Sequence, residues 1–316
     1  MIYLILLPLF IAAILLYFRI AERYSIVDKP NERSSHTIPT IRGGGIIFLL
    51  AAIMSFFWNG YNFPFLLGAL LISGIISFMD DLRPLPNILK FSAHLASVLL
   101  IFKECGILES FAPLYLVGLG FIIIGIINAY NFMDGINGIT GLYSLAVVVP
   151  LLISETNPQI KSLQLFLVMS LVVFNFFNTR LKARCFAGDV GSITLAILIV
   201  FFIIIRIRET GNFCHLGILL IYGIDTIFTL MQRLMNRENI FKSHRKHLYQ
   251  YLSNERNVSQ LLVSSTYALI QLGINFGIVS GFIQITGISI ILMVLTIIYW
   301  IVKVPFLVSN KYPLKT

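Results

Sequence analysis

The sequence predicts an all-α, polytopic integral membrane protein. Three observations support this fold class: the composition, the spacing of apolar runs and the distribution of basic residues. Of the 316 residues, 58% are hydrophobic and 12% are charged, and the mean hydropathy is +0.89. A soluble domain carries about 25% charged residues. The chain lacks the polar side chains that would cover a water-soluble globule, and we interpret residues 1–316 as one transmembrane domain.

Eleven apolar runs, separated by short polar breaks, have about the length of helices that cross a bilayer. They cover residues 2–18, 43–58, 64–79, 88–102, 113–128, 140–153, 162–177, 190–205, 213–230, 259–281 and 285–302. The runs at 43–58 and 140–153 are short, so ten spans is the alternative count.

Basic residues set the predicted orientation. The first run precedes Arg19, the first basic residue, which is the reverse of the order in a signal peptide. The positive-inside rule therefore places the N-terminus outside. Eleven alternating spans then put the C-terminus and 19 of the 23 Lys and Arg residues on the cytoplasmic side. The four exceptions are Lys103, Lys161, Arg206 and Arg208.

Aspartates gather on the same side. All six fall in loops or span ends that are predicted to be cytoplasmic: Asp28, Asp80, Asp81, Asp134, Asp189 and Asp225. Acids that only mark the membrane interface would be spread over both faces. Carboxylates that share one face with lysines and arginines favour a site for a cation and anionic substrates. We therefore relate the net charge of +9 to phosphate and lipid, and not to nucleic acid.

Two acidic motifs are candidates for that site. Asp80 and Asp81 are adjacent, and a cation or a proton relieves the repulsion between neighbouring carboxylates. A solvated helix end stopped by Pro84 is the alternative. Asp189 follows Gly188 directly before an apolar run, where backbone N–H groups favour phosphate oxygens. An ordinary N-cap is the alternative there.

Residues 128–141 carry polar side chains at intervals of three, with glycines beside them. These side chains are Asn128, Asn131, Asp134 and Asn137. On a helix, this spacing places them on roughly one face. A helix-packing stripe would explain the glycines. It would not explain the amides and the acid, because polar groups at membrane depth are costly and usually functional.

Two basic loops complete the set of motifs. The loop at 232–257 contains His244, Arg245 and His247, a group of donors that suits phosphate. A zinc site and a loop that binds lipid headgroups are the alternatives. The loop at 28–45 contains His36 and ends in Arg42 and three glycines. Glycine weakens a helix, so the glycines indicate that the backbone closely approaches a ligand or another helix.

Along the chain, the five motifs occur in the order found in the polyprenyl-phosphate N-acetylhexosamine-1-phosphate transferase family, also called glycosyltransferase family 4, and the sequence resembles that family. The resemblance spans roughly residues 28–250. It implies transfer of an N-acetylamino-sugar 1-phosphate from a UDP-sugar to undecaprenyl phosphate, with release of UMP. It also implies a Mg²⁺ cofactor, with Mn²⁺ as a substitute, and an active site on the cytoplasmic face of the bacterial inner membrane.

The resemblance further implies roles for individual residues. The catalytic residues would be Asp80, Asp81, Asp134 and Asp189, of which Asp189, Asp80 and Asp81 would bind the metal. The substrate-binding residues would be Asn131, Asn137, Gly188, His244, Arg245, His247, Arg42 and His36. The active-site loops would be 22–42, 79–90, 128–141, 178–192 and 231–258. Which aspartate does which task stays open.

Two departures from the family pattern limit which residues and which branch of the family the resemblance implies. Many members have an aspartate where this chain has Asn137, so in this chain no carboxylate can act at that position. The histidine loop lacks the three consecutive histidines of the peptidoglycan translocase. It resembles the branch that initiates O-antigen or other surface polysaccharides, with N-acetylglucosamine, N-acetylfucosamine and N-acetylquinovosamine all open. The alternative function is a multi-span transporter of a lipid-linked or anionic substrate, which would carry ionisable residues deep within its spans.

Overall fold

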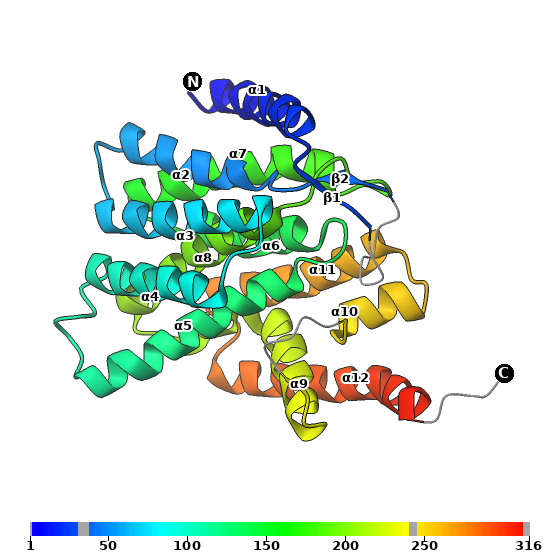
Figure 1. The fold of residues 1–316 in the computed structure, drawn as a ribbon. Coiled ribbons are helices and arrows are strands. Elements are labelled where there is room, and N and C mark those ends of the chain that lie inside the picture. The colour runs from blue at the N-terminus through cyan, green and yellow to red at the C-terminus, as the bar shows by residue number, and fades with distance from the viewer. Residues whose placement is uncertain (1, 31–37, 240–244, 312–316) are drawn as a thin grey trace.

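The computed structural model describes residues 2–30, 38–239 and 245–311, and almost all of the regular structure in them is helical (Figure 1). The elements are α1 Ile2–Arg23, β1 Val27–Asp28, β2 Thr40–Ile41, α2 Ile46–Trp58, α3 Pro64–Leu82, α4 Asn87–Glu104, α5 Pro113–Met133, α6 Ile139–Ser154, α7 Pro158–Asn178, α8 Gly188–Thr210, the 3₁₀ segment η1 Phe213–Leu219, α9 Leu220–Met235, α10 Leu248–Gln250, the π-helical segment η2 Tyr251–Glu255, α11 Gln260–Val279 and α12 Ile285–Lys311. The predicted all-α class is confirmed.

Each predicted apolar run contains a helix, and the run at 213–230 is formed by η1 followed by α9. In the part of the chain that the structure describes, eight helical stretches are long and apolar enough to cross a membrane. The two runs that are short in sequence, α2 and α6, are also the short apolar helices of the structure. The number of crossings and the side of each terminus remain predictions.

Proline starts three of the helices that run toward the same end of the bundle: α3 at Pro64, α5 at Pro113 and α7 at Pro158. Proline suits the first turn because its nitrogen has no hydrogen to leave unpaired. Glu104 adds a cap from the end of α4, since its carboxylate accepts hydrogen bonds from Phe65 N at 2.7 Å and Leu66 N at 2.9 Å.

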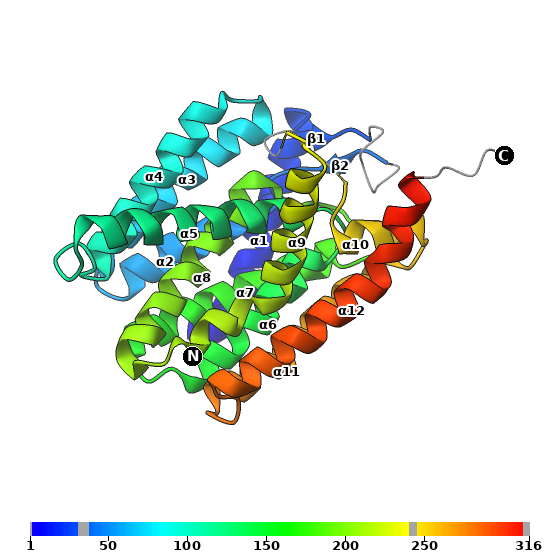
Figure 2. The same cartoon turned by 90° about the horizontal axis from the view of Figure 1, so that it is seen from below.

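Helix α8 forms the core, whereas α12 runs along the edge of the bundle (Figures 1 and 2). In an apolar 18-residue stretch of each helix, 83% of the α8 residues are buried and only 6% of those in α12. Three buried tyrosines join α5, α6 and α9, with the rings of Tyr143 and Tyr222 stacked at 3.5 Å and Tyr130 edge-on to both. The apolar surface of α12 suits contact with lipid.

A close glycine contact brings α2 against α8. A Cβ on Gly45 would lie 2.3 Å from Gly191 Cα, and a Cβ on Gly191 would lie 2.7 Å from Gly45 Cα. Neither position leaves space for a side chain. The glycines at the start of α2 therefore serve the approach of another helix, one of the two explanations that the sequence left open.

Candidate functional site

Contacts between side chains and backbone link all five predicted active-site loops at one end of the bundle, the end where β1, β2 and α10 lie in Figure 1. Arg42 contacts Asp81, and Asp81 contacts the start of α8. The hydroxyl of Ser192 in α8 donates to Asn131 in α5, and Tyr249 donates to the carbonyl of Phe132. The motifs that are dispersed over about 200 residues of sequence thus form one cluster.

Asp81 is fully engaged by groups of the protein. Its side chain is 0% exposed and accepts hydrogen bonds from Asp189 N at 2.9 Å and Val190 N at 3.1 Å. The Nε of Arg42 lies 2.6 Å from its Oδ1. A carboxylate at a helix N-terminus is stabilised by the unpaired N–H groups there. Asp81 therefore caps α8 and holds Arg42 and Asp189 in place.

Asp80 and Asp189 are the less deeply buried members of the carboxylate cluster. Asp80 accepts a hydrogen bond from Leu85 N at 2.6 Å and forms an ion pair with Lys90, whose Nζ lies 3.1 Å away. The Asp189 side chain is 16% exposed and lies 3.1 Å from the Nη2 of Arg42. The two carboxyl groups face each other closely enough to interact directly. The repulsion between two such groups favours a shared proton or a cation between them.

The backbone of residues 41–44, which precede α2, is hydrogen-bonded to the loop that precedes α8. Phe186 N donates to Ile41 O at 2.8 Å, and Gly44 N donates to Phe186 O at 2.8 Å. These bonds place Arg42 between Asp81 and Asp189. Burial alone would lower the pKa of Arg42, but the two carboxylates outweigh it and raise the pKa, so the guanidinium stays charged.

Gly188 is explained by packing. Its φ is +71°, a conformation that side chains disfavour, and a Cβ there would lie 2.5 Å from Asp81 Oδ2 and 2.8 Å from Gly43 N. The close approach of Asp81 to the start of α8 thus requires glycine at this position. Its predicted contact with substrate stays a prediction.

Residues 128–141 do not form the single helix that the threefold spacing suggested. Helix α5 ends at Met133 and α6 begins at Ile139, with Gly138 at φ +83° between them. The glycines and the polar side chains of 134–138 favour this break over a continued helix. Only Asn128 and Asn131 of the four polar residues lie on α5.

The four polar side chains consequently have different surroundings. Asn131 accepts from Ser192 Oγ at 2.9 Å, and Asp134 accepts from Thr140 Oγ1 at 2.7 Å. Burial raises the pKa of Asp134 to about 6. Asn137 is buried and donates to the carbonyls of Arg180 at 2.8 Å and Leu181 at 3.3 Å. Asn137 therefore anchors the loop before α8.

The histidine loop is held from α9, α11 and α5. Asp225 of α9 is 1% exposed and accepts from Leu248 N at 2.8 Å, and His247 Nδ1 lies 3.5 Å from its Oδ1. His247 is 1% exposed, and Arg245 is half-buried. Tyr249 donates to Phe132 O at 2.9 Å. The predicted residues His36 and His244 lie outside the described residues.

The sequence reasoning left several of these residues out of the site. Lys90 pairs with Asp80, Ser192 with Asn131, and Asp225 with the histidine loop. Ser192 lies three residues after Asp189, a spacing that places both on one helix face. No comparable sequence signal links Asp225 to Leu248 in the histidine loop, because this contact joins segments that are distant in sequence.

The carboxylates fit a cation such as Mg²⁺. Among the described residues, no three His, Cys, Asp or Glu side chains converge in the way a protein-only metal site requires. Mg²⁺ in phosphate-transfer sites usually binds one or two carboxylates together with waters and substrate phosphates. Asp189 and Asp80, which face each other, supply such a pair, whereas Asp81 is engaged by three other donors.

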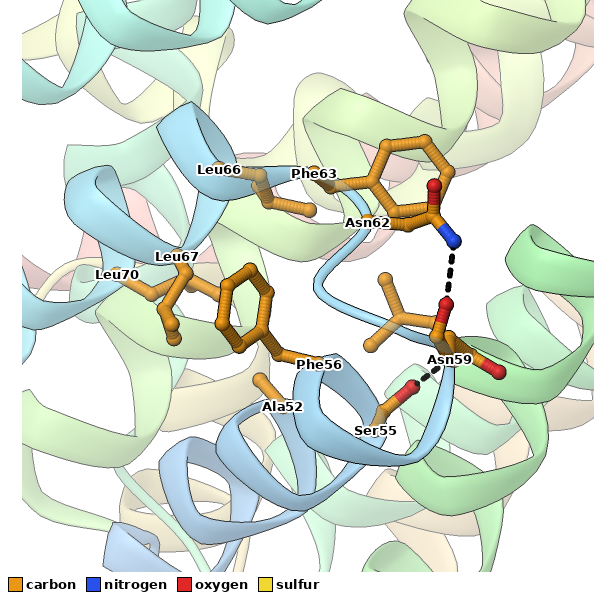
Figure 3. Close-up of a pocket in the computed structure, with 10 residues that line it drawn as sticks. Ala52, Ser55, Phe56, Asn59, Asn62, Phe63, Leu66, Leu67 and Leu70 are labelled. Carbon is orange, nitrogen blue, oxygen red and sulfur yellow. Dashed lines mark hydrogen bonds between the residues drawn. The ribbon is translucent and has the colours of Figure 1, made fainter.

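A pocket at the opposite ends of α2 and α3 has no acid or base in its lining (Figure 3). It is lined by Ala52, Ser55, Phe56, Asn59, Asn62, Phe63, Leu66, Leu67, Leu70 and Leu163. The 13 residues of α2 separate it from the carboxylates by roughly 20 Å.

Comparison with known proteins shows that this chain is similar in sequence to glycosyl transferases and phosphosugar transferases. The glycosyl transferase family 4 profile matches residues 63–207. The probable undecaprenyl-phosphate N-acetylglucosaminyl 1-phosphate transferase of Bacillus subtilis (strain 168) is 24% identical over 256 residues, which cover 74% of this chain and 71% of that protein. The phospho-N-acetylmuramoyl-pentapeptide-transferase of Streptococcus pneumoniae serotype 19F (strain G54) is 29% identical over 252 residues, which cover 68% and 74%. The enzyme of the same name from Dictyoglomus thermophilum is 26% identical over 216 residues, which cover 63% and 70%.

Proposed function

Since the chain belongs to glycosyl transferase family 4, and within it to the polyprenyl-phosphate sugar-1-phosphate transferases, we propose that it transfers an N-acetylamino-sugar 1-phosphate from a UDP-sugar to undecaprenyl phosphate. A phosphate oxygen of the lipid attacks the β-phosphorus of the UDP-sugar, and the bond from that phosphorus to the bridging oxygen breaks. The products are undecaprenyl diphosphate-sugar and UMP. The site lies on the cytoplasmic side of a bacterial inner membrane, and UDP-sugars are made in the cytoplasm.

The observation that carries this proposal is the convergence of acids and cations from five loops at one end of a membrane bundle. Two anionic substrates repel each other, and Arg42 and Lys90 supply positive charge beside the carboxylates. A bound Mg²⁺ would neutralise phosphate oxygens and the charge that develops on the UMP leaving group. Asp189 and Asp80 would hold it.

The different contacts of the two adjacent aspartates support different proposed roles. Asp81 accepts hydrogen bonds and an ion pair from three donors of the protein, so it positions Asp189 and Arg42 and does not take a proton. Asp80 would share the metal with Asp189, and Lys90, which stabilises the ionised form of Asp80, would lie beside the phosphate of the lipid acceptor. Asn131 and Asp134 would shape the nucleotide side of the site, and Arg245 and His247 would bind the diphosphate.

We propose the branch that initiates O-antigen or other surface polysaccharides, because residues 244–247 read His-Arg-Lys-His and contain no run of three histidines. The phospho-N-acetylmuramoyl-pentapeptide-transferases among the relatives favour a second candidate, the peptidoglycan step. The two differ in the sugar nucleotide that they accept.

A substrate panel tests both candidates. Purified protein is incubated with Mg²⁺, undecaprenyl phosphate and one of several UDP-sugars, including UDP-N-acetylglucosamine and UDP-N-acetylmuramoyl-pentapeptide, and UMP is measured. We expect release that requires the lipid, the sugar nucleotide and the metal, and that Mn²⁺ restores after chelation. Release with the pentapeptide substrate alone would assign the peptidoglycan step. Absence of release with every sugar would refute the proposal.

A further inference from the structure

Helix α12 packs on the rest of the protein through half-buried apolar side chains and through two buried polar ones. Among its described side chains, which end at Val304, only Tyr299 and Lys303 are buried, at 3% and 0% exposure. The rest of the helix presents an apolar surface that lipid can cover. A fully buried lysine in such a helix requires an explanation, because an ammonium group removed from water is costly unless it is paired.

Lys303 uses all three hydrogens of its ammonium group. Its Nζ donates to Thr229 Oγ1 at 2.8 Å, to the backbone carbonyl of Lys246 at 2.6 Å and to Tyr299 OH at 2.5 Å. Thr229 lies on α9, and Lys246 directly precedes His247 in the histidine loop. The lysine therefore ties α12 both to α9 and to the backbone beside a predicted substrate-binding residue.

Asp225 holds the same loop from the other side of His247. It accepts from Leu248 N at 2.8 Å and Tyr249 N at 3.3 Å, and also from Tyr267 OH at 2.9 Å. Thr229 Oγ1 lies 3.3 Å from Asp225 Oδ1 and 2.8 Å from Lys303 Nζ. Asp225, Thr229 and Lys303 form one continuous network, which we call the α9–α12 clamp.

The clamp fixes three consecutive peptide groups around one histidine. Lys303 takes the carbonyl of Lys246, and Asp225 takes the amides of Leu248 and Tyr249. Tyr249 then reaches the end of α5 through its hydroxyl. Since buried charged groups rarely add stability by themselves, the value of this network lies in the fixed geometry of the loop.

We propose that Asp225 and Lys303 are positioning residues that hold the His247 segment in the conformation that binds the diphosphate of the sugar nucleotide. This inference rests on the proposed function. It assigns α12, which lies beyond the residues that the family profile matches, a part in substrate binding. The lipid substrate, at Asp80 and Lys90, does not depend on the clamp.

The matched substitutions Lys303→Met and Lys103→Met test this proposal. Each removes one ammonium group and keeps the length of the side chain, but Lys103 is exposed at the far end of α4. We expect Lys303→Met to raise KM for the sugar nucleotide about tenfold or more, while KM for undecaprenyl phosphate and the values for Lys103→Met stay as in wild type. A merely structural lysine would lower the folded fraction and leave both KM values unchanged, and that result would overturn the proposal.

Hydrogen exchange provides a readout that needs no turnover. We expect the amides of Leu248 and Tyr249 to exchange slowly in wild type and at least tenfold faster in Lys303→Met, with the amides of α8 unaffected. Equal exchange in the two proteins would contradict the clamp, whereas a wild type without UMP release would refute only the proposed function. If Lys303→Met does not fold, Thr229→Val removes the shared hydroxyl with little change in volume and is expected to show the same exchange in weaker form. Unchanged exchange in Thr229→Val would then contradict the clamp.

Discussion

The two halves of the site are held in place by different kinds of contact. In the carboxylate half, formed by Arg42, Asp80, Asp81 and Asp189, backbone packs against backbone at Gly45 and Gly191, and Asp81 caps the most buried helix of the protein. In the histidine half, residues 245–249, single polar side chains from α9 and α12 hold the loop. We therefore expect the first half to be most sensitive to added volume and the second to the loss of a polar atom.

The comparison teaches which half performs which task. A metal and two phosphates must be held to within a fraction of an ångström for phosphoryl transfer, and the glycine contact between α2 and α8 supplies that rigidity. In the histidine half, polar side chains from α9 and α12 hold the segment around His247 in one conformation, which on the proposed function binds the sugar nucleotide. Four predictions test this difference, from the largest expected effect to the smallest.

The largest effect is expected at Asp189. Asp189→Asn keeps the shape of the side chain and removes the charge that would bind the metal, so we expect turnover to fall by about a thousandfold or more. The protein should remain folded, because Asp81 and not Asp189 caps α8. UMP release and thermal unfolding measure the two effects.

Glu209→Gln is the control for Asp189, since Glu209 is exposed at the other end of α8, where it pairs with Arg206. Turnover of Asp189→Asn within tenfold of wild type would remove Asp189 from the metal site and, with it, the proposed chemistry of the carboxylate half.

The next effect tests the packing of the carboxylate half. A Cβ on Gly45 would lie 2.3 Å from Gly191 Cα, and backbone atoms cannot move aside cheaply. We expect Gly45→Ala to destabilise the protein by about 2–3 kcal/mol and to lower kcat as well, as measured by thermal unfolding in detergent and by UMP release. Gly125→Ala on α5, where nothing lies within 4 Å of the added Cβ, is the control and should be neutral. Equal stability of the two variants would contradict the rigid contact.

A smaller effect is expected at the tether between the histidine half and α5. Tyr249→Phe removes the hydroxyl that donates to Phe132 O at 2.9 Å and keeps the ring. The loss of one neutral hydrogen bond costs about 1 kcal/mol, so we expect KM for the sugar nucleotide to rise about fivefold and kcat to change little. Tyr115→Phe, at an exposed position, serves as the comparison. A pure kcat defect would show that the tyrosine acts on the chemical step.

The smallest effect concerns pH. Burial raises the pKa of Asp134 to about 6 in the folded protein, above the value of 3.8 for an unperturbed aspartate. The folded state therefore binds the proton more tightly, and this contribution to stability is complete below about pH 4 and is lost as the pH rises through 6. We expect Asp134→Asn to match wild type at pH 4 and to be more stable by about 1 kcal/mol at pH 7 without metal, since the group is partly exposed. A stability difference that does not vary with pH would contradict the raised pKa.

The sequence predicts most of the helices, and the reason is their continuous apolar runs. It also predicts that Asp80, Asp81, Asn131 and Asp189 come together, because family motifs and the sidedness of the loops both point to one end of the bundle. It does not predict the break at 134–138, because the threefold spacing fits a helix as well as a helix end followed by a turn.

Tertiary contacts decide the rest of the site. Asn137 resembles a substrate ligand in sequence, but in the structure it binds the carbonyls of Arg180 and Leu181. Asp225 and Lys303 lie 78 positions apart in apolar helices, and their shared partner Thr229 carries no sequence signal. Such assignments require knowledge of which helices are neighbours.

The most direct test of the central claim is the identity of the lipid product. Wild type and Asp189→Asn are incubated with Mg²⁺, undecaprenyl phosphate and the UDP-sugar that supports UMP release, and the lipids are analysed by mass spectrometry. We predict undecaprenyl diphosphate-sugar in the wild-type sample and only undecaprenyl phosphate in the sample of the variant. A lipid that carries a single phosphate and the sugar, or equal product in both samples, would contradict phosphosugar transfer at the carboxylate cluster.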